Sequence, residues 1–204
     1  MFTTIPEPER WRLRFPEAVK SHFHFLKQFG FRIEHEEATL VRFCSDAVVV
    51  AVYHGRASYE IGIEFARINV PGERYGLYEV LLLAQRAGRI KEIPKSDFQT
   101  STQEGVETAV EKIASLVEAH AVPLLEGDPS TYSRLGVQRT REAAAYTKEV
   151  LDQAVRRRVD DAWEDKDYET VVRLYEQIQG RLSPSEFMKF EFAKKQLTVI
   201  HGQN

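Results

Sequence analysis

Hydrophobic and polar positions along the chain repeat first with the period of a helix and then with that of a strand. Residues 16–29 space their apolar side chains three and four apart, and Pro16 and Gly30 are a helix start and a helix stop. From residue 30 to residue 68 the spacing of apolar positions falls to two, the period of a strand with one covered face. The pattern therefore predicts an N-terminal helix followed by a sheet.

Four short apolar runs make up the predicted sheet, and they are FRIEHE, TLVRFC, AVVVAVY and SYEIGIEFARI. Only short breaks separate them, and short connections join antiparallel neighbours, because a parallel crossover needs about a dozen residues or more. We expect a four-stranded antiparallel meander with one covered face and one polar face. The charged side chains expected on the open face are Arg32, Glu34, Glu60 and Glu64.

Two further helices are predicted after the strands. Residues 76–87 form a short helix that is apolar on most sides. Ser101 and Glu104 have the spacing of a capping box, and they open a helix that Pro123 ends. Together with the sheet, these helices predict the α+β fold class for a first domain that covers residues 1–132.

The remaining third of the chain differs in composition. Residues 126–136 are rich in turn formers and are predicted to be a linker. From about residue 139 the sequence is charged and helix-forming, with Arg156 and Asp160 spaced as a helix-stabilising pair. The sequence predicts a helical C-terminal segment of about three helices over residues 137–204.

The last predicted helix has the clearest start signal in the chain. Ser183 is the cap, Pro184 occupies the first helical position and Glu186 completes a capping box. The helix before it, KDYETVVRLYEQIQG, is expected to end at Gly180.

Within that preceding helix, four side chains fall at the spacing of the second helix of a tetratricopeptide-like repeat, and they are Tyr168, Val171, Tyr175 and Ile178. Residues 140–197 therefore resemble a single, degenerate tetratricopeptide-like helical hairpin. Val171 stands where these repeats usually carry a small residue, and the sequence shows no second copy. The resemblance implies contact with another protein rather than catalysis. For the N-terminal α+β region no family resemblance is identified.

Composition narrows the classes of function. The chain of 204 residues has a formal net charge of −3, which is too mild to predict a nucleic-acid or membrane partner. Cys44 is the single cysteine, so a reducing compartment is expected. The N-terminus shows no secretory signal, and the apolar runs are far shorter than the roughly 20 residues that span a bilayer. We expect a cytoplasmic protein of bacterial style.

The histidine pair in SHFHF raises the question of a metal site. On a helix, His22 and His24 point about 200° apart, so they cannot bind one metal ion. His22 falls on the apolar stripe of its helix, as His120 does on a later helix. Two such histidines either converge on a shared pocket or a proton-sensitive contact, or they remain separate core residues with their own hydrogen-bond partners. No metal or cofactor site is predicted.

Two carboxylates share a strand face in the predicted sheet. Glu60 and Glu64 are expected about 7 Å apart on that face, which would suit acid–base chemistry. The simpler interpretation is that they form solvated ion pairs with Arg32 or Arg42 across the sheet. No catalytic residue is assigned.

These observations predict a non-enzymatic protein–protein interaction module, either an immunity or antitoxin-type protein or a scaffold that binds another protein or itself. The aromatic residues expected at its interaction surface are Trp163, Tyr168, Tyr175, Phe187, Phe190 and Phe192. The alternative is a small-ligand-binding protein or a hydrolase with a site between sheet and helices. That site would use His22, His120 and either Glu60 or Glu64.

Overall fold

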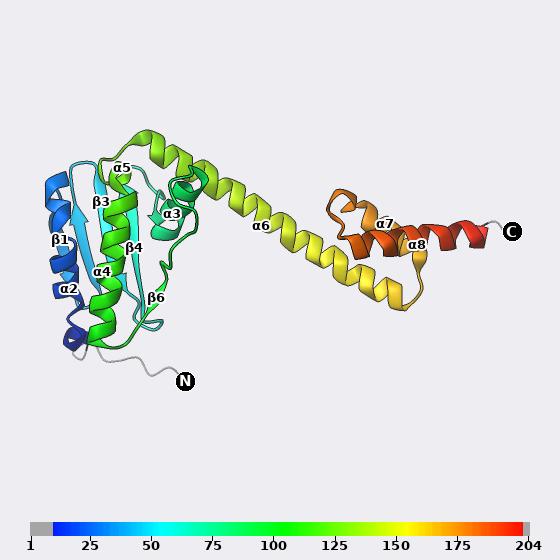
Figure 1. Cartoon of the computed structure of the whole chain (residues 1–204), viewed down its shortest axis with the longest axis horizontal. Coiled ribbons are helices and arrows are strands. Elements are labelled where there is room, and N and C mark those ends of the chain that lie inside the picture. Colours follow the sequence, from blue (N-terminus) through cyan, green and yellow to red (C-terminus); the bar gives the residue numbers. More distant parts are fainter. Residues whose placement is uncertain (1–9, 202–204) are drawn as a thin grey trace. The chain divides into compact units, whose positions relative to one another are not determined.

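The computed structural model describes residues 10–201, without the side chains of residues 200 and 201, and it has the predicted α+β fold. The chain divides into two compact units, the first ending at Arg139 and the second beginning at Thr140 (Figure 1). The first unit contains the sheet, and the second contains only helices among its described residues. The expectation that the N-terminus carries no secretory signal falls mainly on residues 1–9, outside the described residues.

Between residues 10 and 139 the chain forms one antiparallel sheet of six strands. The strands are β1 (Arg32–Glu37), β2 (Leu40–Cys44), β3 (Val48–His54), β4 (Glu60–Arg67), β5 (Tyr75–Gly76) and β6 (Phe98–Gln99). Strands β1 to β5 pair in chain order, and β6 pairs with β4. The predicted four-stranded meander is confirmed as β1 to β4. The strands β5 and β6 are too short to produce a periodic pattern.

Helical segments precede and follow the sheet. In the first unit they are η1 (Trp11–Leu13), α2 (Phe15–His22), η2 (His24–Phe29), α3 (Leu77–Arg86), α4 (Gln103–His120) and α5 (Val122–Leu125). Helix α6 (Pro129–Glu164) begins in the first unit, and α7 (Tyr168–Glu176), η3 (Gln179–Arg181) and α8 (Pro184–His201) belong to the second. Along residues 10–201 no helix has the length and the apolar content to cross a membrane.

Helices cover one face of the sheet. In Figure 1, α2 and α4 lie side by side across the strands, and α4 contacts β4 while α2 contacts β2. Because side chains alternate along a strand, Val48, Val50 and Val52 of β3 all point to the covered face, where they are fully buried. The first unit therefore has one hydrophobic core between the sheet and this helical layer.

The predicted helix over residues 16–29 is wrong in its second half. Helix α2 ends at His22, and after Phe23 the chain winds as the 3-10 helix η2 until Gly30. Phe23 and Phe25 are both buried, whereas a continuous α-helix would point them about 200° apart. The change of winding allows both rings to enter the core.

The start of α4 is shifted by one residue from the prediction. Thr102, not Ser101, is the cap, and its hydroxyl accepts a hydrogen bond from the Gly105 amide at 3.1 Å. Threonine and serine both cap through a hydroxyl, so adjacent candidates are hard to separate by pattern alone.

The predicted linker over residues 126–136 is also wrong, because most of it is the start of α6. The carboxylate of Asp128 accepts hydrogen bonds from the amide and hydroxyl of Thr131, and the hydroxyls of Thr131 and Ser130 lower the pKa of Asp128 to about 2. Tyr132 is fully buried in the core, and its hydroxyl donates to the Leu124 carbonyl at 3.2 Å. The turn formers here cap a helix whose first turns pack against the core of the first unit.

The second unit packs three helical segments around a small core of its own. Its buried residues are Val159, Ala162, Val171, Leu174, Tyr175, Ile178, Phe190 and Ala193. The predicted capping box of the last helix is confirmed: the Ser183 amide donates to Glu186 at 2.6 Å, and the Glu186 amide donates to the Ser183 hydroxyl at 3.3 Å. Gly180 does not end α7 directly, since it lies inside η3.

His54 is a buried polar residue of the first unit that the strand pattern places inside. It is 1% exposed, its Nε2 bonds the Thr100 carbonyl at 2.9 Å, and its Nδ1 has no hydrogen-bond partner among the described residues. Burial lowers the pKa of His54 below the ordinary value of 6.5; the Thr100 carbonyl acts in the opposite direction, and Arg10 lowers it further. The imidazole is therefore neutral in the folded protein at pH 7.

This burial predicts a pH dependence of stability. Below about pH 6.5 the unfolded chain binds a proton at residue 54 before the folded chain does, so the free energy of unfolding falls as the pH decreases. The slope from one such group is at most about 1.4 kcal/mol per pH unit. Urea unfolding of the wild type and of His54→Gln, compared from pH 7.5 to pH 5, isolates this residue from the other histidines. Parallel pH profiles for the two proteins would contradict the prediction.

Candidate functional site

The two histidines of SHFHF have separate partners, although His24 lies in η2 and not on the continuous α-helix that the predicted angle assumes. Nε2 of His22 lies 2.7 Å from a carboxylate oxygen of Glu107 on α4. His24 is exposed, and its Nδ1 bonds the Ser21 carbonyl at 2.8 Å. His22 is thus half-buried and forms a contact between α2 and α4. Within the described part of the chain, no group of three or more His, Cys, Asp or Glu side chains could hold a metal ion.

The residues of the alternative ligand site do not come together. His120 ends α4, thirteen residues after Glu107, and a helix rises about 20 Å over that distance. Glu64 lies on the uncovered face of the sheet, where Arg74 approaches it to 3.8 Å. The expected 7 Å between Glu60 and Glu64 is wrong, because four residues of strand span about 13 Å. The sheet separates these carboxylates from His22.

The aromatic residues predicted at an interaction surface divide into two groups. Tyr175 and Phe190 are buried in the core of the second unit, so they are not available to a partner. Trp163, Tyr168 and Phe192 contact one another, with ring centroids 5.6–5.9 Å apart. Phe187 is exposed at the start of α8. The hairpin therefore buries two of its aromatic residues in its own core, and the others lie in a ring cluster or at the surface.

Helix α8 carries apolar side chains on two faces. Phe190 and Ala193 face the core, whereas Met188, Phe192 and Val199 lie about 100–200° around the helix and are exposed. The second unit thus exposes apolar side chains of α8 in addition to those that form its core.

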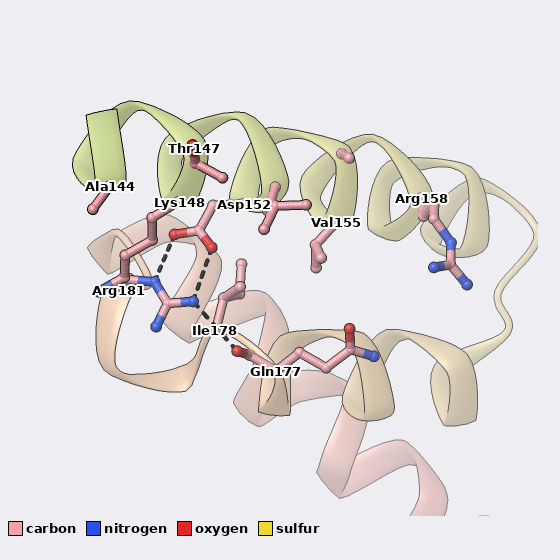
Figure 2. Close-up of a pocket in the computed structure, with 11 residues that line it drawn as sticks. Ala144, Thr147, Lys148, Asp152, Val155, Arg158, Gln177, Ile178 and Arg181 are labelled. Carbon is pink, nitrogen blue, oxygen red and sulfur yellow. Dashed lines mark hydrogen bonds and ion pairs between the residues drawn. The ribbon is translucent and has the colours of Figure 1, made fainter. Parts of the chain in front are cut away.

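An open groove of about 690 Å³ lies between α6 and the α7–η3 segment of the same unit (Figure 2). Figure 2 shows Val155 of α6 and Ile178 directed into the space between the two segments. Leu151, one turn before Val155, also lines the groove and is 61% exposed. These three side chains give the groove an apolar floor, to which Ala144 and Ala154 add.

A bidentate ion pair closes one end of this groove. Arg181 of η3 donates from Nε and Nη2 to the two carboxylate oxygens of Asp152 at 2.6 and 2.8 Å. Asp152 is almost fully buried, and the hydrogen bonds from Arg181 lower its pKa. Since both carboxylate oxygens are engaged, Asp152 holds η3 against α6 and is not free to act as a base.

The ion pair continues into a polar network at the turn before α8. Arg156 donates from Nη2 to the Arg181 carbonyl at 3.1 Å and from Nε to Glu186 at 2.7 Å. Burial would raise the pKa of Glu186, but hydrogen bonds from the Ser183 amide and from Arg156 lower it overall. The predicted pairing of Arg156 with Asp160 is replaced by this one, and Lys189 contacts Asp160 instead at 3.3 Å.

The charges on the rim of the groove are mostly positive. Lys148 and Arg158 line it from α6, and Arg181 lines it from η3, while Asp152 is the single lining carboxylate and is already paired. An apolar floor with a cationic rim can hold an apolar side chain whose neighbours are acidic. No described residue here forms a nucleophile–base pair.

Sequence reasoning missed this groove because its two walls come from segments far apart in the chain. One signal was present: Ala144, Leu151 and Arg158 recur every seven residues on one face of α6. Arg156 and Arg158 are two residues apart on α6 but have different structural roles, since Arg156 pairs with Glu186 and Arg158 lines the groove.

The ion pair at the end of the groove predicts unequal effects of two aspartate substitutions. Asp152→Ala removes both acceptors of Arg181, so we expect a clear loss of thermal stability and a looser η3. Asp160→Ala removes an exposed contact to Lys189 and should change the free energy of unfolding by less than about 0.5 kcal/mol. Thermal unfolding followed by circular dichroism makes the comparison. Equal midpoints for the two variants would refute a structural role for Asp152.

Comparisons with family models, with curated proteins and with solved structures found no match to this chain. Its function is therefore inferred from the arrangement of its own side chains.

Proposed function

We propose that the protein is a non-enzymatic interaction module that captures a helical segment of another protein in the groove of its second unit. The observation that carries the proposal is Leu151, a large apolar side chain that is 61% exposed on the floor of a concave, cation-rimmed groove. Exposed apolar surface in a groove marks binding sites more often than isolated exposed residues do.

The groove favours an amphipathic helix with acidic flanks as its occupant. Its floor is a line of apolar side chains on α6 at positions 144, 151 and 155, seven and four residues apart, and such a line along one helix face suits contact with another helix. Lys148 and Arg158 stand beside that line and would meet Asp or Glu on the incoming helix. A basic helix would meet like charges there.

The kind of partner and the cellular compartment are inferred from the chain's composition and from its resemblance to a tetratricopeptide-like hairpin. The three helical segments of the second unit resemble a tetratricopeptide-like hairpin and the first helix of a following one, which supports protein contact as the role. A near-neutral net charge of −3 favours a protein over a nucleic acid as the partner. With a single cysteine, the protein suits the reducing cytoplasm, where an immunity or antitoxin-type protein or a scaffold would act.

Photo-crosslinking in living cells tests the proposal. A photoreactive phenylalanine analogue placed at Leu151 in the full chain should crosslink a partner in the native host. Mass spectrometry should then locate the crosslink in an amphipathic segment rich in Asp and Glu. Reversing the rim with Lys148→Glu and Arg158→Glu should lower the crosslinking yield by about tenfold, because two attractive contacts become repulsive.

Val150 provides the matched control, since it is also exposed but lies 100° around α6 from Leu151 and does not line the groove. The same analogue at Val150 should not crosslink that partner. If both positions give the same products, or if the crosslinked segment is basic, the groove is not the binding site.

A further inference from the structure

The central strand β3 is apolar on both faces, although the helices of the first unit cover only one of them. Val48, Val50 and Val52 are fully buried beneath the helices. Val49, Ala51 and Tyr53 point to the opposite face, where they line an open hollow of about 660 Å³. A strand with one solvated face normally alternates apolar and polar residues, and continuous apolar sequence is typical of strands covered on both faces. The outer face of β3 thus has the composition of a covered surface.

Charged side chains cross this hollow in one row. Arg42, Ala51 and Glu64 are direct neighbours across β2, β3 and β4 in the strand register. Glu34 extends the row on the β1 side, 3.7 Å from Arg42, and Arg74 extends it on the β5 side, 3.8 Å from Glu64. From β1 to β5 the row therefore reads negative, positive, apolar, negative, positive, with β3 at its centre.

This order of charges is complementary to itself after a half-turn about an axis along β3. Such a rotation places a second sheet face to face with the first and reverses the order of the row. Glu34 then faces Arg74 of the second copy, Arg42 faces Glu64 of the second copy, and Ala51 faces Ala51. A half-turn about an axis perpendicular to the strands would instead place each charge opposite itself, so the charges select one of the two arrangements.

We propose that a second copy of this chain docks on the open face of the sheet, with the twofold axis along β3. This contact goes beyond the partner-binding groove, because it uses another surface on the other unit and a different occupant. Aligned sheets pack within about 30° of each other, so the long arginine side chains at the ends of the row can still reach their partners.

The middle of the face is shaped for close approach. The side chain of Tyr53 lies over Gly62 of β4, where a Cβ atom at Gly62 would come within 3.0 Å of the hydroxyl oxygen and two ring carbons. The rotation sets the two Tyr53 rings on opposite sides of the axis, so they do not collide. Ala51 and Ala66 leave a shallow floor between the charges. Small side chains at the centre let the two sheets meet in van der Waals contact.

The interface is small, which sets the concentrations to be tested. Five strands span about 19 Å across the sheet, so the buried area falls at the low end for specific contacts. The dimer should therefore dissociate with a constant in the micromolar range or weaker. Sedimentation equilibrium of the full chain from about 1 μM to 1 mM should show a reversible monomer–dimer transition that weakens as salt increases. A monomer throughout this range would overturn the proposal.

Two charge reversals give the decisive test. In homodimers of Arg42→Glu, residue 42 of each copy faces Glu64 of the other, so two repulsive contacts form. In homodimers of Glu64→Arg, residue 64 of each copy faces Arg42 of the other, so two repulsive contacts between positive charges form. Each variant alone should dimerise at least about tenfold more weakly than the wild type. An equimolar mixture restores both opposite-charge contacts, and its heterodimer should approach the wild-type constant within about threefold.

Lys112→Glu supplies the control, because Lys112 is exposed on α4, on the side of the sheet that the helices cover. It makes the same change of charge and should leave the dimerisation constant unchanged. Circular dichroism should show that all variants keep the fold. If the mixture of Arg42→Glu and Glu64→Arg chains associates no better than either variant alone, the twofold pairing is wrong.

Discussion

The N-terminal unit depends on the burial of the apolar central strand β3. Each valine that its inner face removes from water contributes about 1.5–3 kcal/mol, and Val48, Val50 and Val52 are all fully buried. Helices α2 and α4 lie on that face, and the change of winding at Phe23 lets neighbouring aromatic rings join the same core. The outer face of β3 is also largely apolar in sequence, but no described helix of the first unit covers it. Within this unit, one face of the sheet is therefore covered by helices and the other is open.

The helical unit obtains its form from polar as well as apolar contacts. Its core of eight residues is small, and the bidentate pair of Asp152 and Arg181 fixes η3 where apolar packing alone would leave it loose. Buried or half-buried ion pairs are often neutral for stability, but they restrict the allowed arrangements because a misplaced partner leaves a charge unsatisfied. Here the restriction falls on the turn between α7 and α8. Arg181 of that turn also lines the groove between α6 and the α7–η3 segment.

The sequence predicts local features of this fold well and long-range ones poorly. Strands β1 to β4 and the capping box at Ser183 are encoded within a few residues, and both predictions are confirmed. The contact of His22 with Glu107 joins residues 85 positions apart, and no periodicity specifies it. The start of α6 was missed because Asp, Pro and Ser serve both as turn formers and as helix caps. The groove itself depends on where Arg181 is held, which only the packed hairpin determines.

The two open surfaces differ in a way that assigns them different partners. The groove of the helical unit carries Lys148 and Arg158 on its rim, while its single carboxylate, Asp152, is paired with Arg181, so two copies of the groove would repel each other. The row across the sheet reverses its signs about its centre, so in the proposed dimer each charge would face an opposite charge of the second copy. A chain that dimerises through the sheet presents two grooves in one particle. A partner with two acidic helices would then bind with an avidity greater than either groove provides alone, because the second contact forms within the complex.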